Sequence, residues 1–196
     1  MDAVDDTTGF SDMGGLAPTR RISENFKAGN ADVTFVSSDE VLFYIHRKNL
    51  ETNAEGFPSA EFDTGGEIVP LTETAVTLEL LFQFIYPRRH PDLEDTTFEI
   101  LAPLAEAAEK YQVFSAMTIC KIRMKDFLPQ HGVEIFNYAS RHGYKDILSA
   151  AAPSVLDIPL DELVKKLSLQ LVVPWFTNSL VRSAIEMPGA VLHSRQ

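Results

Sequence analysis

An acid, an imidazole and a cation lie around one predicted β-hairpin, and no other residues in the chain have a stronger claim to chemistry. Asp32 begins the hairpin, and His46 and Arg47 follow it directly. Such a set can move protons or form a charged pocket. An isolated Asp at a strand start is more often a structural or interface charge. A histidine at the end of a hairpin more often joins the hairpin to the next helix by hydrogen bonds. We therefore assign no catalytic residue.

The remaining titratable groups form no catalytic or metal-binding pattern in the sequence. The helical metal motif needs two histidines four residues apart, and no two histidines of this chain have that spacing. The single cysteine, Cys120, falls on the apolar stripe of its expected helix, where free Cys usually packs as a small hydrophobe. We therefore expect no enzymatic activity, no metal and no cofactor. The histidines are His46, His90, His131, His142 and His193.

A short basic motif near the start of the chain predicts a modification site. Arg20-Arg21-Ile22-Ser23 matches the pattern that arginine-directed kinases accept. Residues 1–28 are rich in Gly, Asp and Thr and have no periodic apolar pattern, so we expect them to be a mobile tail. Ser23 within that tail is the candidate phosphosite.

The hairpin that carries Asp32 and His46 is predicted by alternation of apolar and polar residues. Val33 and Phe35 alternate with Thr34, and the same alternation returns in residues 41–45 after a polar loop at 37–40. This period of two is typical of strands with one buried face. The expected inward residues of the second strand are Val41, Phe43 and Ile45.

One more strand and several helices follow. Residues 48–54 favour a short helix, and residues 67–71 favour a strand in which Pro70 fits only at a sheet edge or at the end of the strand. Thr72 or Thr74 is expected to cap a helix that ends at Pro87. Its buried stripe is Leu78, Leu81, Phe82 and Ile85.

From residue 88 the pattern is a loop and then helices. We expect helices at 102–112, from a cap at Ser115 to Pro129, from 131 to a C-terminal Gly143, at 144–152 before Pro153, at 161–167 and at 168–187. Strands come early and helices late, which is typical of the α+β class. The expected parts are the tail at 1–28, a sheet-bearing domain at 29–128, a helical extension at 129–187 and a C-terminal tail at 188–196.

Charge and composition restrict the partners and the compartment. The net charge is −11, and 13 acidic residues stand against two arginines between Glu51 and Glu109. Nucleic-acid surfaces need clustered Lys and Arg, so we expect no nucleic-acid partner. No stretch approaches the ~20 apolar residues needed to cross a bilayer. The start of the chain has no signal-peptide pattern, so a cytoplasmic or nuclear protein is expected.

Several segments in order resemble the BTB/POZ domain, in its fungal branch especially. The resemblance covers about residues 28–165, including a helical tail whose matching run is 135–143. It implies a BTB/POZ-like small β-sheet capped by helices and followed by an α-helical extension. The other matching segments are Ala31-Asp32-Val33, Ser37-Ser38-Asp39, Phe43-Tyr44-Ile45-His46-Arg47, Val69-Pro70-Leu71-Thr72-Glu73, Leu81-Phe82-Gln83-Phe84-Ile85-Tyr86-Pro87 and Ala107-Ala108-Glu109-Lys110-Tyr111.

The resemblance also implies protein partners and frequent homodimerisation. The dimer pocket of the family would correspond to Asp32 and Arg47. Many members dock on cullin-type ubiquitin ligase scaffolds through a hydrophobic-any-acidic triplet before the helix of the Ala-Ala-Asp-Lys-Tyr run. The matching positions, 100–102, read Ile-Leu-Ala and lack the acid. We therefore expect weak or absent cullin binding.

Two function classes follow from these observations. The first is a non-enzymatic interaction module, an adaptor or scaffold that recruits protein partners. The alternative is a small-ligand-binding protein or enzyme that uses a pocket between the BTB-like part and the helical extension. Convergent polar side chains around Asp32, His46 and Arg47 in a closed cavity would favour the alternative.

Overall fold

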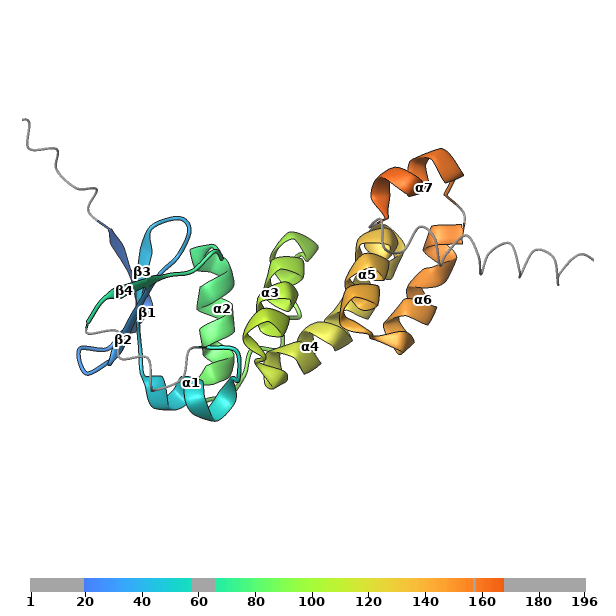
Figure 1. The fold of residues 1–196 in the computed structure, drawn as a ribbon. Coiled ribbons are helices and arrows are strands. Elements are labelled where there is room, and N and C mark those ends of the chain that lie inside the picture. The colour runs from blue at the N-terminus through green and yellow to red at the C-terminus, as the bar shows by residue number, and fades with distance from the viewer. Residues whose placement is uncertain (1–19, 58–65, 157, 168–196) are drawn as a thin grey trace, which may run out of the picture.

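The protein has a small sheet at one end and a series of helices that lead away from it (Figure 1). The computed structural model describes residues 20–57, 66–156 and 158–167. This arrangement confirms the α+β class. In chain order the elements are β1 (Arg21–Lys27), β2 (Val33–Val36), β3 (Val41–Ile45), α1 (Arg47–Asn53), β4 (Ile68–Pro70), α2 (Ala75–Ile85), α3 (Phe98–Tyr111), α4 (Phe114–Met124), η1 (Lys125–Phe127), α5 (Leu128–His142), α6 (Lys145–Leu156) and α7 (Leu160–Lys166).

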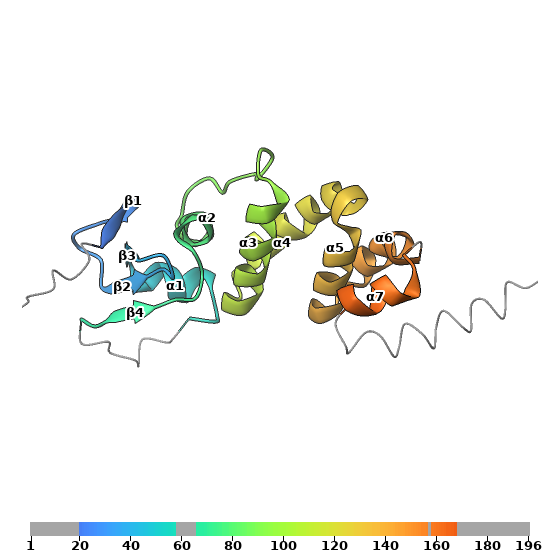
Figure 2. The same cartoon turned by 90° about the horizontal axis from the view of Figure 1, so that it is seen from above.

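The four strands pair in the order β1-β3-β2-β4, and Figure 2 shows β1 and β4 at opposite edges. β2 and β3 form the predicted antiparallel hairpin, in which Phe35 faces Phe43. Phe43 and Ile45 are 0% exposed, whereas Leu42 and Tyr44 are half-buried. The predicted register is therefore confirmed, as is the edge position of β4.

The prediction of a mobile tail is wrong for residues 21–27. They form β1, which pairs in parallel with β3. Phe26 is 2% exposed, and its ring lies 5.6 Å from that of Phe82 and 6.2 Å from that of Phe43. The buried residues of β1 are three apart, so the strand lacks the period of two that sequence reasoning searches for. Residues 1–19 lie outside the described residues.

α1 and α2 lie close to where they were predicted, but α2 has an unexpected cap. Neither Thr72 nor Thr74 uses its side chain to cap the helix. Asp39, in the turn of the hairpin, accepts the backbone N–H of Ala75 at 2.7 Å. Burial acts against ionisation of Asp39, yet hydrogen bonds from Ser37 and from the Ala75 N–H lower the pKa of its carboxyl. A tertiary contact thus supplies the group that helix termini require.

Three predicted helix boundaries are wrong because prolines were given too much weight. α3 begins at Phe98, four residues early, with Pro103 inside it. Pro129 lies in the first turn of α5, where a proline costs little. Pro153 lies inside α6. Ser149, whose carbonyl the proline cannot bond, is exposed, so water can reach that carbonyl.

Two further boundaries were tested by the structure. Ser115 was expected to cap a helix, but α4 begins at Phe114 with Val113 at its N-cap. Gly143 ends α5 in the left-handed region at φ 75°, as predicted. α5 and α6 pack closely at Gly132, since a Cβ there would lie 2.2 Å from the Cβ of Ser154.

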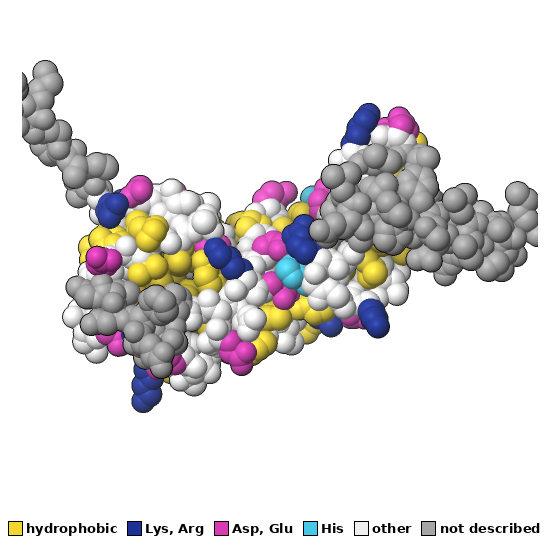
Figure 3. Space-filling view, in the orientation of Figure 1, with side chains coloured by type: hydrophobic (Ala, Val, Ile, Leu, Met, Phe, Trp, Pro, Cys, Tyr) yellow, Lys and Arg dark blue, Asp and Glu magenta, His cyan; other side chains and the backbone are white. Residues whose placement is uncertain are grey.

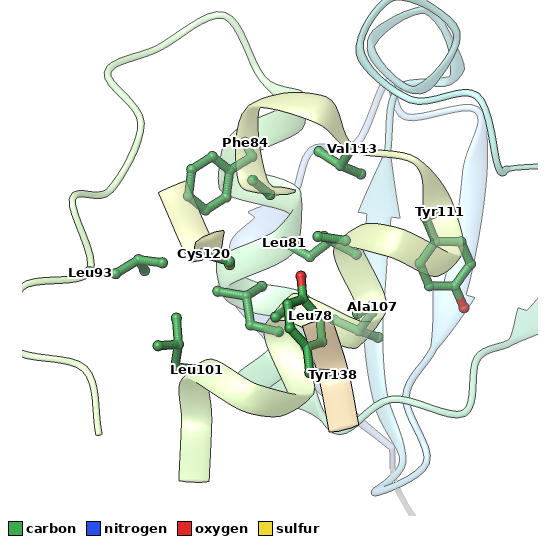
Figure 4. Close-up of a cluster of buried hydrophobic side chains, with 14 of the residues drawn as sticks. Leu78, Leu81, Phe84, Leu93, Leu101, Ala107, Tyr111, Val113, Cys120 and Tyr138 are labelled. Atoms are coloured by element: carbon green, nitrogen blue, oxygen red, sulfur yellow. The ribbon is translucent and has the colours of Figure 1, made fainter. Parts of the chain in front are cut away.

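One hydrophobic core runs from the sheet into the helices. Figure 4 shows Leu78 and Leu81 of α2 with Leu101 of α3, Cys120 of α4 and Tyr138 of α5 in one cluster. α5 begins at Leu128, next to the predicted boundary at 129, yet the core crosses it. The helix predicted at 168–187 and the C-terminal tail at 188–196 lie outside the described residues.

Candidate functional site

The structure brings Asp32, His46 and Arg47 together at the start of α1. Asp32 Oδ1 accepts the backbone N–H of Arg47 at 2.6 Å. His46 provides no side-chain cap for this helix, so a carboxylate from the head of β2 takes that place. The bond explains why an acid begins the hairpin, since it joins the hairpin to the helix that follows.

His46 connects the hairpin to α2, rather than to α1 as expected. Its backbone N–H donates to the Tyr86 hydroxyl at 3.1 Å, and its Nδ1 lies 2.9 Å from the same oxygen. Its Nε2 lies 3.2 Å from Oδ1 of Asn30. These bonds position the sheet on α2. The two cavities described below are lined by other residues.

A second network fastens the loop before α2 to the end of α3. Lys110 Nζ donates to Glu73 at 2.8 Å and to the Thr72 hydroxyl at 2.8 Å. The Tyr111 hydroxyl donates to the other oxygen of Glu73 at 2.7 Å. The ring of Tyr111 stacks on Phe57 at 4.3 Å. The network therefore fixes the start of α2 against the end of α3.

The pKa values of this network follow from its geometry. Burial disfavours the Glu73 anion, but hydrogen bonds from Lys110, Tyr111 and Thr72 outweigh it and lower the pKa of Glu73. Burial and the neighbouring Glu73 carboxylate raise the pKa of Tyr111 to about 12. At neutral pH Glu73 is therefore an anion and Tyr111 a neutral donor.

Beside this network lies a groove of about 640 Å³ between α2 and α3, which we call the α2–α3 groove. Ile100, Pro103 and Ala107 line it from one face of α3. Val76 lines it from the first turn of α2 and is 54% exposed. Three carboxylates and one amine lie among the lining residues. The complete lining is Thr72, Glu73, Thr74, Val76, Thr77, Glu99, Ile100, Pro103, Glu106, Ala107 and Lys110.

The α2–α3 groove combines apolar walls with a charged rim. Lys110 pairs with Glu73 and Arg141 pairs with Glu106, so Glu99 gives the rim its negative charge. Pro103 has no N–H, so the carbonyl of Glu99 lacks its usual helical donor. Apolar walls with carboxylate and carbonyl acceptors suit an apolar side chain next to a cation.

A third polar network joins α3 to α5. Glu109 accepts the hydroxyls of Tyr138 (2.9 Å) and Tyr144 on one carboxylate oxygen. Glu106 bonds Arg141 and lies 2.9 Å from Nε2 of His142. On the face drawn in Figure 3, acidic, basic and histidine side chains mix over the middle of the molecule, whereas hydrophobic ones gather over the sheet end.

A cavity of about 290 Å³ lies at this junction, where the alternative function placed its pocket. Its volume is at the lower limit of ligand pockets. Burial and the charge of Glu109 raise the pKa of Tyr138 and raise the pKa of the nearby Cys120 thiol to about 12. Both groups are therefore protonated near neutral pH. The lining is Phe98, Ala102, Glu106, Met124, Glu134, Asn137, Tyr138 and Arg141.

Sequence reasoning missed the α2–α3 groove because it placed the start of α3 too late. Ile100 and Leu101, expected before the helix, lie inside it. Ile100 lines the groove and Leu101 is 0% exposed. The available signal was Thr96-Thr97 followed by Glu99, since a threonine before an early acid favours a helix start.

Ser23 lies on β1 and is 3% exposed. In this conformation its hydroxyl is inaccessible to a kinase. The phosphosite therefore stays a prediction, and the reason first given for it, a mobile tail, does not hold.

No protein-family model matches the chain, and no curated protein matches it. None of the described helices is long and apolar enough to span a bilayer. Among residues 20–57, 66–156 and 158–167, His, Cys, Asp and Glu form no group that could hold a metal ion.

Proposed function

We propose that this protein is a non-enzymatic protein–protein interaction module that binds a partner through the α2–α3 groove. The observation that carries the proposal is an aliphatic side chain, Val76, left 54% exposed in a hollow with apolar walls. Apolar surface that is hollowed and surrounded by charge is typical of binding sites.

The partner is a segment with an apolar side chain next to Lys or Arg. Glu99 supplies the negative charge at the rim, and the acidic excess between Glu51 and Glu109 steers a basic partner towards it. Binding of this kind weakens with added salt, because exposed charges are screened.

The class of module is BTB/POZ, with a helical extension. The support is that segments carrying the BTB/POZ resemblance are bonded to one another in the fold. Glu73 from the 69–73 segment bonds Lys110 and Tyr111 from the 107–111 segment, and Asp32 bonds the backbone of Arg47. The residues that carry the resemblance thus form hydrogen bonds that join separate elements of the fold. An adaptor or scaffold role follows from the class.

Self-association is part of this proposal. The class implies a dimer that uses Asp32 and Arg47. Sedimentation velocity of the full chain at several concentrations tests it. Mass independent of concentration and equal to one chain would exclude the dimer while leaving the groove proposal in place.

The groove is tested by a photo-crosslinking residue in place of Val76 and by a matched pair of variants. A partner captured at this position is purified and its affinity for the full chain measured by calorimetry. Val76→Asp should weaken binding at least tenfold, about 1.4 kcal/mol. Ile122→Asp makes the same change on α4, where Ile122 is 57% exposed, and should leave the affinity unchanged. Equal affinities of both variants and the wild type would show that the groove is not the site.

A further inference from the structure

β1 is held to the sheet mainly at its ends. The recorded pairs with β3 are Arg21 with Val41, Ile22 with Leu42, and Lys27 with Tyr44, and the register shifts between Ile22 and Lys27. The middle of the strand therefore bulges away from regular pairing. Such irregular edges contribute less to strand stability than a continuous ladder.

Side chains hold the middle of β1 to α2 instead. Ser23 Oγ donates to Glu79 Oε1 and accepts the backbone N–H of Phe26 at 3.1 Å. Asn25 Nδ2 donates to the other oxygen of Glu79 at 3.1 Å. We call Ser23, Asn25 and Glu79 the Glu79 latch. One carboxylate, 56 residues away from Ser23 in the chain, thus holds the middle of the strand, beside the packing of Phe26 on Phe43 and Phe82.

The Glu79 latch keeps Ser23, the serine of the Arg20-Arg21-Ile22-Ser23 motif, in a buried position. Arg20 and Arg21, three and two residues before Ser23, are exposed, whereas Ser23 is 3% exposed. A kinase needs the serine hydroxyl at the transferred phosphoryl group. Arg21 thus lies at the surface, and Arg20 has only an exposed pair with Glu40 to leave. The hydroxyl is buried, so transfer requires that β1 first leave α2.

We propose that Ser23 is a phosphorylation site for an arginine-directed Ser/Thr kinase, and that its phosphorylation keeps β1 detached from α2. In the transfer, Ser23 Oγ forms a bond to the γ-phosphorus of ATP, the bond to ADP breaks, and the hydroxyl proton passes to the base of the kinase. The product carries about −1.5 to −2 charges at pH 7. Returned to its place, it would lie against the Glu79 carboxylate in a buried site, which like charge and desolvation both oppose.

Detachment of β1 exposes a surface other than the α2–α3 groove. It uncovers the edge of β3 and the aromatic slot where Phe26 meets Phe43, Phe82 and Tyr86. The phosphorylated protein therefore presents a strand edge with an apolar slot beside it, a surface that accepts added strands. The proposal concerns regulation and is independent of the partner proposed above.

The test is phosphorylation of the full chain by a purified arginine-directed Ser/Thr kinase with Mg²⁺ and ATP, with the site mapped by tandem mass spectrometry. Wild type should be modified at Ser23 slowly. Glu79→Ala should be modified about tenfold faster, because it removes the acceptor of both latch bonds. The matched variant Glu51→Ala, exposed on α1, should match wild type, and Ser23→Ala should remain unmodified at this site.

Hydrogen exchange of the phosphorylated protein gives the second readout. Amides 21–27 should exchange as in an unfolded segment, while those of the β2–β3 hairpin stay protected. If Glu79→Ala does not fold, as judged by circular dichroism, Asn25→Ala replaces it, with an expected increase of about threefold. Absence of phosphate on Ser23 in every variant, equal rates with and without the latch, or a protected β1 after phosphorylation would each overturn the proposal.

Discussion

The β2–β3 hairpin with α2 and the α3–α5 junction are both buried contacts between elements, but they are built from different chemistry. In the first, Phe35 and Phe43 pack on Phe82 with ring centres 5.7 and 5.4 Å apart. In the second, the carboxylate of Glu109 joins two tyrosine hydroxyls.

This difference decides which region makes the free energy of unfolding depend on pH. Apolar burial contributes in proportion to area and is insensitive to pH. A carboxylate–tyrosine network contributes less, since folding exchanges hydrogen bonds with water for hydrogen bonds within the protein. It also depends on which groups are ionised. The hairpin core should therefore set the total stability, and the junction its response to pH.

The largest effect is expected for Phe43→Ala. Phe43 is 0% exposed, and truncation of a core Phe costs ~3–5 kcal/mol, a large share of the stability of a domain. The measurement is urea unfolding followed by circular dichroism. Tyr44→Ala, on the half-buried outer face, is the control and should cost clearly less. The reverse order would contradict the register of β3.

Glu109→Ala should have an intermediate effect, about 2 kcal/mol. It leaves Tyr138 and Tyr144 without their acceptor, and an unsatisfied buried donor costs ~1–3 kcal/mol. Tyr138→Phe removes one donor and leaves Tyr144 bonded, so it should cost about half as much. The same unfolding assay measures both. If Glu109→Ala costs as much as Phe43→Ala, the junction is no weaker than the hairpin core.

Alkaline pH should destabilise the networks and not the hairpin core. The folded pKa values of Tyr111, Tyr138 and Tyr144 are raised above 10 by burial and neighbouring carboxylates, that of Tyr111 to about 12. A raised tyrosine pKa gives stability that is complete below pH 10 and is lost as pH rises through the folded value. The slope is at most ~1.4 kcal/mol per pH unit for each tyrosine.

Unfolding free energies at pH 8, 10 and 11 measure this loss. The double variant Tyr138→Phe with Tyr144→Phe should show a flatter pH dependence than wild type. Tyr44→Phe, on the outer face of the sheet, is the control and should follow wild type. A double variant as steep as wild type would show that these tyrosines are not responsible.

The smallest effect is expected on titration with the N-terminal region of a cullin. The BTB/POZ resemblance sets Ile100, Leu101 and Ala102 at the place of a cullin-docking triplet. They lie within α3, and Ala102 supplies no charge. Calorimetry should give little or no heat of binding. A dissociation constant at or below the micromolar range, ~8 kcal/mol, would mean that another acid, such as Glu99, replaces the missing one.

Local patterns in the sequence predicted the parts that local contacts decide. Alternation along residues 33–36 and 41–45 predicted both strands and the inward side of Phe43. The stripe through Leu78 and Ile85 predicted α2, and Gly143 predicted the end of α5. In each case the deciding interactions lie within a turn or across a short loop. Residues close together in the sequence are therefore enough to predict the element.

The candidate sites were less predictable. Asp32, His46 and Arg47 were placed together correctly, because they flank one hairpin. The α2–α3 groove was missed, since its walls come from residues about 25 positions apart and its floor depends on where α3 begins. Pro103 was treated as a first-turn residue and Pro129 and Pro153 as helix ends, whereas exposure or a first-turn position makes each proline tolerable inside its helix.

The sequence by itself determined the α+β class, the β2–β3 hairpin and the main buried stripes of the helices. The reason is that periodic burial is encoded residue by residue. Only the tertiary structure decided that residues 21–27 are a strand, because Glu79 and the ring of Phe82 hold them from over 50 residues away in the chain. It also decided the cap of α2 by Asp39 and the junction through Glu109. These bonds join groups whose separation along the chain carries no local signal, and their free energy exists only once the elements have packed.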